Sequence, residues 1–424
     1  MQFNAQHLRL LATASLLSLL TVVLLLATKD TDAAGKYIVK TPSKPQLQSQ
    51  SQSQTCPSDE PWDFIPSRDA DNHGLSAEQC RIAFPKLFFD IDESADARRN
   101  RSISFKEIDS TEVGDGVVRA GIFDGELYII DMGAMPYTQS RAKASLHALH
   151  RALTTTPDRH TLPNTEFVFT TDDFAADPTD GAIWTYSKRA GDTGSWLMPD
   201  FGYWAWPEVQ IGPYRETRAR MASVDASVAF REKKNQLLWR GSLAPNPGLR
   251  TRLLKAALDK PWASVRVLDW DDPTDIAYNR LPIEDHCRYM FLAHTEGRSF
   301  SGRGKYLFNC RSVVVAHRLE WREAHHAALV AGGPEANVVI VERDYEDLGR
   351  KIEFLVDHPE VAERIADNAV QSLRDRYLTP AAESCYWREL VRMYASVCEF
   401  EPVLVGRDGK ARGVPFESWV LGSR

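Results

Sequence analysis

The feature that most constrains the fold is an alternation of strand-like and helix-like segments along most of the chain. Short apolar or β-branched runs at 166–170, 265–268 and 312–316 alternate with stretches whose apolar residues recur every three or four positions, as at 140–153 and 283–293. The first pattern is typical of buried strands and the second of amphipathic helices. Their alternation predicts an α/β fold with parallel sheets in doubly wound layers.

A charged break divides this alternating region into two runs. Residues 231–235 read Arg-Glu-Lys-Lys-Asn, with strand and helix signals on both sides. Because 424 residues exceed what one ordinary hydrophobic core accommodates, we expect two α/β domains, at 61–235 and 236–400, followed by a tail at 401–424. Ligands of such sheets bind beyond the carboxyl ends of the strands, so we expect the active site in a cleft between the domains.

The N-terminal segment has a different composition. Residues 10–28 are uncharged and leucine-rich, and this run is long enough for a transmembrane helix. Arg9 and the amino terminus lie before it, whereas Lys29, Asp30 and Asp32 follow it, so the positive-inside rule places residues 1–9 in the cytosol and the rest in the lumen. A single-pass signal anchor is expected, with a cleaved signal peptide as the alternative. The Gln- and Ser-rich residues 29–60 are expected to form a flexible stem or a plain disordered spacer.

Charge and cysteine content narrow the class of protein. The net charge of −7 argues against general nucleic-acid binding, so any basic site must be local. Six cysteines follow the apolar run, and in an oxidising lumen they permit disulfides, with buried free thiols as the alternative. They are Cys56, Cys80, Cys287, Cys310, Cys385 and Cys398. Asn100 begins an N-glycosylation sequon, which is consistent with a lumenal glycoprotein.

The densest polar motif is the decapeptide at 296–305, Glu-Gly-Arg-Ser-Phe-Ser-Gly-Arg-Gly-Lys. Glycines let backbone N–H groups approach an anion, and the cations neutralise its charge. The motif predicts a site for a phosphate-bearing ligand, with an exposed basic turn as the alternative. Ser242, in a glycine turn after a predicted strand, and Arg250, at the start of the next predicted helix, suit the same phosphate, although this motif taken alone favours a simple strand–helix turn with a surface arginine.

Three further motifs have two interpretations each. Asp172 and Asp173 directly follow a predicted strand, where one of them can act as a general base or simply cap the next turn. The aromatic cluster at 199–207 suits either stacking on a sugar or core packing. Asp90 and Asp92 have a spacing that some transferases use to bind a metal, but this pattern is common by chance.

Taken together and in this order, the motifs resemble glycosyltransferase family 90, the capsule-associated and protein O-glucosyltransferase-like family. The matching segments are 239–242, 285–289, 297–307 and 385–387. The resemblance implies a GT-B arrangement of two Rossmann-like domains facing a cleft. It also implies transfer of glucose or xylose, with inversion, from UDP-glucose or UDP-xylose to a protein or polysaccharide acceptor. No tightly bound cofactor and no metal are implied, and the enzyme would be a type II protein of the Golgi or endoplasmic reticulum membrane.

The resemblance also assigns roles to individual residues. Asp173 would be the general base, with Asp172 as the alternative, and Arg252 is the alternative to Arg250. It favours a disulfide between Cys287 and Cys310, and one from Cys385 to the region of Cys80. A catalytically inactive lumenal protein that binds a sugar or nucleotide with the same fold is the alternative function. The UDP diphosphate would be held by Ser242, Arg250, Arg298, Ser299, Phe300, Ser301, Gly302 and Arg303.

Overall fold

The computed structural model describes residues 62–173, 182–406 and 409–422. The predicted transmembrane run at 10–28 and the predicted stem at 29–60 lie outside these residues. Within the described ranges, the search for a helix long and apolar enough to cross a bilayer finds none. The membrane anchor and the stem therefore stay predictions.

The second half of the chain forms a five-stranded sheet in the order β12-β10-β9-β7-β8, with every pair of neighbours parallel. Each residue of β9 and β10 is buried, as expected for strands covered by helices on both faces. The parallel sheet predicted for this half is confirmed. Its strands are β7 (Lys234–Gly241), β8 (Ala263–Val267), β9 (Tyr289–His294), β10 (Val313–His317) and β12 (Val339–Val341).

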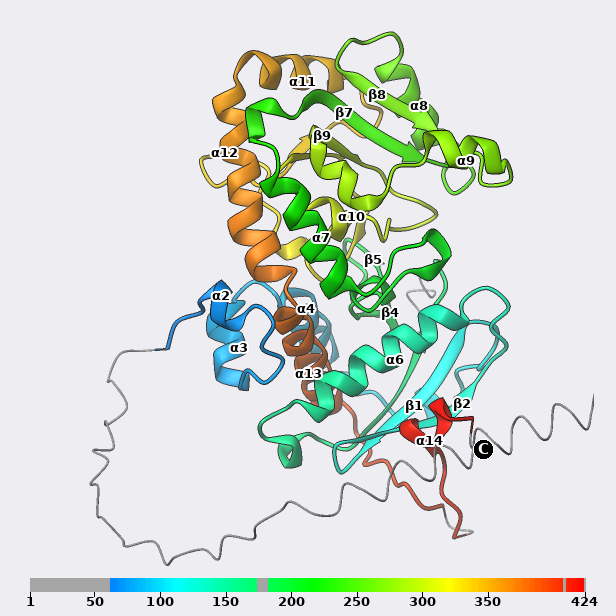
Figure 1. Ribbon diagram of the computed structural model, residues 1–424. Coiled ribbons are helices and arrows are strands. Elements are labelled where there is room, and N and C mark those ends of the chain that lie inside the picture. The colour runs from blue at the N-terminus through cyan, green and yellow to red at the C-terminus, as the bar shows by residue number, and fades with distance from the viewer. Residues whose placement is uncertain (1–61, 174–181, 407–408, 423–424) are drawn as a thin grey trace, which may run out of the picture. The chain divides into compact units, whose positions relative to one another are not determined.

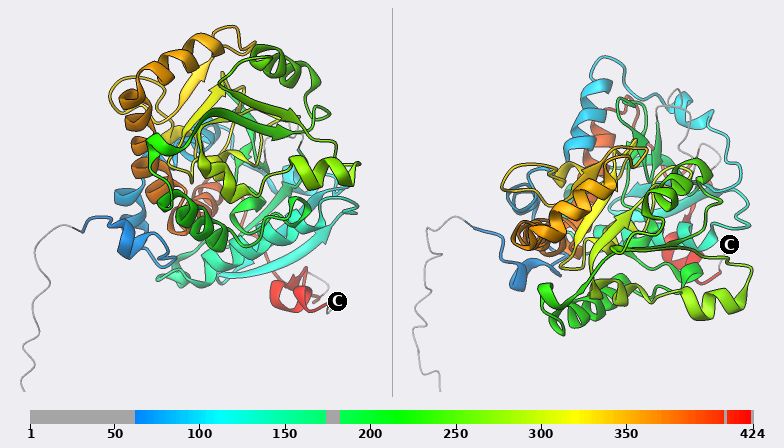
Figure 2. Two further views of the ribbon diagram at one scale, coloured as in Figure 1. Left: turned by 45° about the horizontal axis from the view of Figure 1, so that its top comes forward. Right: turned by 90° about the horizontal axis from the view of Figure 1, so that it is seen from above.

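Helices with clear start signals cover this sheet. Asn246 caps the first turn of α8 through the backbone N–H of Leu249, with Pro247 in the first helical position, where its missing N–H is harmless. Figure 2 shows α11 and α12, in orange, beside the yellow strands of the sheet, where they bury the apolar side of the strands. The α-helices of this half before residue 370, apart from a single turn at 304–307, are α8 (Pro247–Ala257), α9 (Pro273–Asn279), α11 (Leu348–Asp357) and α12 (Pro359–Ala369).

The first half forms a six-stranded sheet in the order β13-β2-β1-β3-β4-β6. The prediction of a parallel sheet is wrong for its larger part, because β13, β2, β1 and β3 pair antiparallel and only β3, β4 and β6 are parallel. Asp124 and Gly125 both have positive φ, so they form a two-residue hairpin turn that returns the chain beside itself. The strands are β1 (Val117–Phe123), β2 (Glu126–Met132), β3 (Thr165–Thr170), β4 (Ile183–Thr185), β6 (Trp196–Leu197) and β13 (Val414–Pro415).

Three consecutive helices run from the parallel sheet to the mixed sheet. The helices α12, η7 (Val370–Tyr377, a π-helix) and α13 (Pro380–Ser396) follow one another down one side of the molecule in Figure 1. At its lower end α13 packs against α3 (Ala77–Ala83), α4 (Phe89–Arg98) and α6 (Gln139–Thr154), and the Cys80–Cys385 disulfide fixes it to α3. The last long helix of the chain thus packs on elements of the first half, and the division at residue 235 stays a prediction.

Aromatic side chains dominate the core around the first sheet. The rings of Phe167 and Trp184 stack with centroids 3.9 Å apart, and Tyr394 of α13 meets Trp184 edge-on. In the cluster at 199–207, Phe201 and Tyr203 are buried in this core, which favours the packing interpretation for Tyr203, whereas Phe201 also lines the pocket described below.

The remaining helices and strands complete the described chain. They are α2 (Pro66–Asp69), α5 (Phe105–Asp109), α7 (Tyr214–Ala226), α10 (Gly304–Leu307), α14 (Phe416–Val420), η1 (Arg159–Thr161), η2 (Phe201–Tyr203), η3 (Pro207–Val209), η4 (Phe230–Glu232), η5 (Ile283–Arg288), η6 (His326–Ala328) and the antiparallel pair β5 (Lys188–Arg189) and β11 (Trp321–Arg322).

Candidate active site

A pocket of about 550 Å³ lies where the carboxyl ends of strands from both sheets meet. Asp173 follows β3, Ser242 follows β7, and the loop from Gly297 to Arg303 follows β9, and all of these contribute to its lining. The volume is within the usual range for small-molecule sites. This is the location that the strand pattern predicted, with residues from both halves of the chain on its wall.

Three arginines concentrate positive charge on one wall of the pocket: Arg240, Arg250 and Arg303. The guanidinium groups of Arg250 and Arg303 each lie 5.9 Å from the centroid of the Trp239 ring. Burial lowers the pKa of Arg250 to about 10, and burial together with Arg250 lowers the pKa of Arg303 to about 9. Both values are above neutral pH, so the two side chains stay charged there.

The hydrogen bonds of these arginines go to neutral oxygen atoms. Arg250 donates to the carbonyl groups of Ser242 (2.6 Å) and Glu296 (3.2 Å), and Arg303 donates to the carbonyl group of Arg240. Among the described residues, no carboxylate forms an ion pair with any of the three. A buried charge needs a counter-charge, so this wall is suited to an anionic ligand.

The residues predicted to bind the ligand from the loop after β9 fall into two groups, and the first group lines the pocket. Arg298, Phe300, Ser301, Gly302 and Arg303 line the pocket. The loop is a tight turn in which the N–H group of Gly297 donates to the carbonyl of Phe300 at 3.0 Å. A Cβ atom added to Gly297 would lie 3.0 Å from that same carbonyl oxygen, so this close backbone approach favours glycine.

Two residues of the motif support the loop instead of lining the pocket. The hydroxyl of Ser299 is buried and donates to the backbone carbonyl of Asp173. Lys305 is fully buried, and its ammonium group pairs with Asp200 at 2.6 Å and donates to the carbonyl of Gly302 at 2.7 Å. The expectation that the cation of Lys305 neutralises a ligand is therefore wrong, because Asp200 already neutralises it.

Asp173 lies in the pocket lining with its side chain 37% exposed. Its Oδ1 atom accepts a hydrogen bond of 2.7 Å from Arg141 of α6, and that guanidinium lies 4.8 Å from the centroid of the Phe201 ring. The pair holds the carboxylate in one orientation while leaving it open to the pocket. Asp172 is exposed and does not line the pocket, and Arg252 is likewise exposed, on another side of α8 from the buried Arg250.

Several lining residues were not singled out from the sequence. Arg240 and His286 lie inside segments that carried the family resemblance, so those segments contained a signal for them. Arg141 comes from the first turn of an ordinary amphipathic helix, and its role depends on where α6 packs in the fold. No local pattern marks it.

The Cys287–Cys310 disulfide braces the site, and it is the pairing that the resemblance implied. It links η5, which carries His286, to the residues that follow α10. Of the other cysteines, Cys56 lies outside the described residues, and Cys398 is a half-buried free thiol.

The Asp90–Asp92 pattern has a structural explanation. The carboxylate of Asp90 is buried in α4, where it accepts a hydrogen bond of 3.0 Å from Arg322. Lys188 lies 3.8 Å from the same carboxylate oxygen, so Asp90 connects α4 to the β5–β11 pair. The described geometry gives no support to the metal interpretation of this motif.

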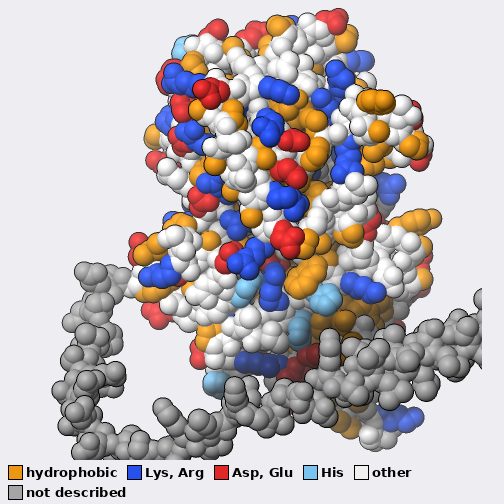
Figure 3. Space-filling model, viewed as in Figure 1, with side chains coloured by type: hydrophobic (Ala, Val, Ile, Leu, Met, Phe, Trp, Pro, Cys, Tyr) orange, Lys and Arg blue, Asp and Glu red, His pale blue; other side chains and the backbone are white. Residues whose placement is uncertain are grey.

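The surface charge agrees with a local site. On the face shown in Figure 3, basic and acidic side chains are interleaved and form no continuous basic field. With a net charge of −7, the concentration of guanidinium groups in the pocket is a local departure from the rest of the molecule.

Comparison with known proteins identifies the family. The sequence profile of Glycosyl transferase family 90 matches residues 78–410, and the chain belongs to this family. It is 28% identical over 222 residues to an O-glucosyltransferase rumi homolog of Aedes aegypti, a match that covers 48% of this chain and 54% of that protein.

Two further relatives have similar names. The chain is 23% identical over 266 residues to O-glucosyltransferase rumi of Drosophila melanogaster, covering 57% of this chain and 62% of that protein. It is 25% identical over 266 residues to human Protein O-glucosyltransferase 1, covering 56% and 64%. The chain therefore spans about half to two thirds of the length of the curated relatives it matches.

His286 provides a test of the pocket's electrostatics. Burial, with Arg303 and Arg240 nearby, lowers the pKa of His286 to about 3, whereas an unfolded histidine has a pKa of about 6.5. Between these pH values the unfolded chain binds more protons, so the free energy of unfolding decreases as the pH falls from about 6.5 toward 3. We expect His286→Gln to reduce that slope by up to about 1.4 kcal/mol per pH unit.

Urea unfolding between pH 4 and pH 7 measures the slope. His358→Gln is the matched control, because His358 is exposed at the end of α11 and this substitution should leave the slope unchanged. Equal slopes for His286→Gln and the unsubstituted chain would contradict the buried, neutral state of His286.

Proposed function

We propose that this chain is an inverting glycosyltransferase that uses a UDP-sugar and acts on a protein hydroxyl in the secretory pathway. The observation that carries the proposal is the wall of buried guanidinium groups without carboxylate partners, facing an open carboxylate in one pocket. Family membership supports a glycosyl transfer reaction. The names of the relatives support glucose as the sugar and a protein as the acceptor, with xylose and a polysaccharide as the alternatives.

In the proposed reaction the diphosphate of the donor lies against Arg250, Arg303 and the loop N–H groups. Asp173 takes the proton of the acceptor hydroxyl as its oxygen attacks the anomeric carbon of the sugar. The bond from that carbon to the diphosphate oxygen breaks on the opposite face, which inverts the configuration and leaves UDP. The guanidinium groups stabilise the charge that develops on the leaving diphosphate.

Arg141 has a positioning role in this proposal. Its hydrogen bond to Oδ1 of Asp173 orients the carboxylate and leaves the other oxygen for the acceptor proton. The hydrogen bond from Ser299 to the carbonyl of Asp173 connects the base to the loop from Gly297 to Arg303, here called the diphosphate loop. Two contacts therefore position the base: one from Arg141 in the first half of the chain and one from Ser299 in the second half.

The compartment and domain limits are part of the same proposal. Two disulfides among the described residues support an oxidising environment, as in the lumen of the endoplasmic reticulum or Golgi. We propose a type II protein, with residues 10–28 as its membrane anchor, 29–60 as its stem, and GT-B domains at 61–235 and 236–400.

The proposed general base is tested by Asp173→Asn. We expect UDP release from UDP-glucose in the presence of a protein acceptor to fall by about 10²–10⁴-fold, because the amide cannot take the proton. UDP affinity, measured by calorimetry, should stay the same. Asp172→Asn is the matched control and should keep turnover, since Asp172 does not line the pocket.

The same assay separates the alternatives. UDP-xylose in place of UDP-glucose tests the sugar, and omitting the acceptor separates transfer from hydrolysis. UDP binding without any turnover of the unsubstituted chain would favour the inactive binding protein of the same fold. Full turnover in Asp173→Asn would exclude Asp173 as the base.

The wall formed by Arg240, Arg250 and Arg303, here called the diphosphate wall, is tested by Arg250→Gln. Losing a charged hydrogen-bond donor should weaken UDP binding by about ten- to a hundredfold, which corresponds to roughly 1.5–3 kcal/mol. Arg252→Gln changes an exposed arginine on the same helix and should leave the affinity unchanged. Thermal unfolding of both variants shows whether the fold is kept, and equal UDP affinities for the two folded variants would contradict the assignment.

A further inference from the structure

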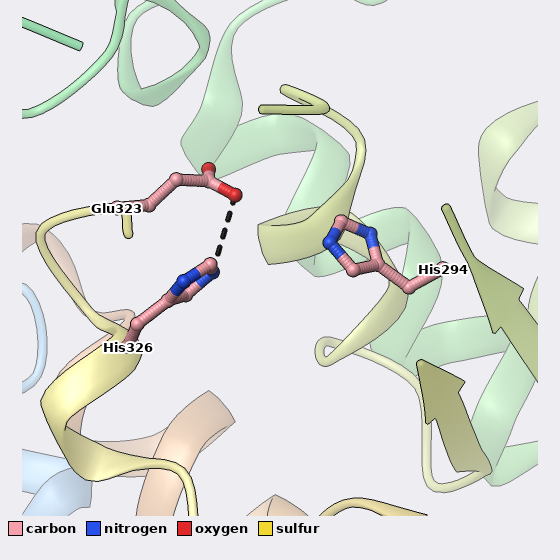
Figure 4. A group of neighbouring side chains, drawn as sticks. All are labelled: His294, Glu323 and His326. Carbon is pink, nitrogen blue, oxygen red and sulfur yellow. Dashed lines mark ion pairs between the residues drawn. The ribbon is translucent and has the colours of Figure 1, made fainter. Parts of the chain in front are cut away.

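A second group of polar side chains lies behind the diphosphate loop and outside the pocket. His294 is the last residue of β9, Glu323 directly follows β11, and His326 begins η6. Figure 4 shows Glu323 and His326 together on one side of a small space, with the ring of His294 facing them from the other side. None of the three lines the pocket.

The three side chains present ligand atoms to a common point. One ring nitrogen of each histidine and one carboxylate oxygen of Glu323 all lie within 4.8 Å of one another. The Nε2 atom of His326 lies 3.2 Å from Oε2 of Glu323. His294 and Glu323 are each 2% exposed, so water does not solvate them from outside.

The hydrogen bonding of this group is incomplete. Among the described residues, neither oxygen of Glu323 accepts a hydrogen bond of good geometry, and its contact with His326 is limited to the 3.2 Å approach of Nε2. Buried polar atoms without partners are rare and destabilising, so these atoms require an explanation.

Neighbouring residues do not supply the missing partner. Lys305 is near enough to Glu323 to influence its charge, but its ammonium group pairs with Asp200 at 2.6 Å. An ion pair with His326 would engage only one of the two unpartnered oxygens of Glu323. A positive ion between the three side chains would be held by this buried carboxylate and by the ring nitrogen of His294 that faces it.

We propose that His294, Glu323 and His326 bind one divalent transition-metal ion of the Zn²⁺ type. Two imidazole nitrogens and one carboxylate oxygen form a ligand set that suits Zn²⁺, and a water molecule would complete a four-coordinate site. A harder ion such as Mg²⁺ prefers oxygen ligands, which disfavours it here. This site is separate from the proposed sugar transfer, because the diphosphate wall is built from other residues.

The ion would act as a structural brace for the diphosphate loop. A Cβ atom added to Gly304 would lie 2.8 Å from the His294 ring, so this ring packs directly beneath the turn that carries Arg303. Glu323 and His326 come from the segment between β10 and β12. Binding an ion would therefore fix the end of β9 and the turn at Gly304 to that segment.

Calorimetric titration of Zn²⁺ into the tag-free full chain, after dialysis against a chelator, tests this site. We expect about one ion per chain, and a tenfold or greater loss of affinity in His326→Gln. His325→Gln is the matched control, because His325 is the buried neighbour in the same turn and does not belong to the three. It should bind Zn²⁺ like the unsubstituted chain.

A second variant and a second readout keep the test decisive. Glu323→Gln preserves the size of the side chain and should also lose affinity. Zn²⁺ should raise the melting temperature of the unsubstituted chain and leave that of both ligand variants unchanged. The proposal would be overturned if the unsubstituted chain did not bind Zn²⁺ stoichiometrically, or if His326→Gln and Glu323→Gln bound Zn²⁺ as tightly as the unsubstituted chain. Either result would hold whatever the affinity for UDP.

Discussion

Buried positive charge held by backbone carbonyl groups is the constraint on which the rest of the site depends. Arg250 and Arg303 are placed by hydrogen bonds to the carbonyl groups of Ser242, Glu296 and Arg240, which fix their geometry without neutralising them. A carboxylate in the same place would have stabilised the free chain and occupied the site of an anion. The pocket is therefore prepared for a ligand that brings its own negative charge.

The two sheets are both needed to assemble this arrangement. The parallel sheet brings the turns after β7 and β9 to one edge, as its topology requires. The mixed sheet contributes Asp173 at the end of β3, and Ser299 of the loop reaches across to the carbonyl of that residue. Lys305 makes a similar connection to Asp200. These two contacts connect the loop after β9 to the part of the chain that carries Asp173 and Asp200.

Local patterns predicted most of the second sheet and the loop residues, because buried parallel strands and glycine-rich turns have strong signals in the sequence. The antiparallel part of the first sheet was missed, although the Asp124-Gly125 turn that causes it is a recognisable hairpin signal. Lys305 was misjudged because its partner Asp200 is distant in sequence. Arg141 has no signal of its own, since its contact with Asp173 arises only once α6 is packed in the fold.

The central claim is that the pocket recognises a diphosphate through these guanidinium groups. Calorimetric affinities of the full chain for uridine, UMP and UDP at one salt concentration test it most directly. The account predicts that affinity rises with each added phosphate, with a charged contact contributing about 1.5–3 kcal/mol. Equal affinities for uridine and UDP would contradict it, because the buried positive charge would then play no part in binding.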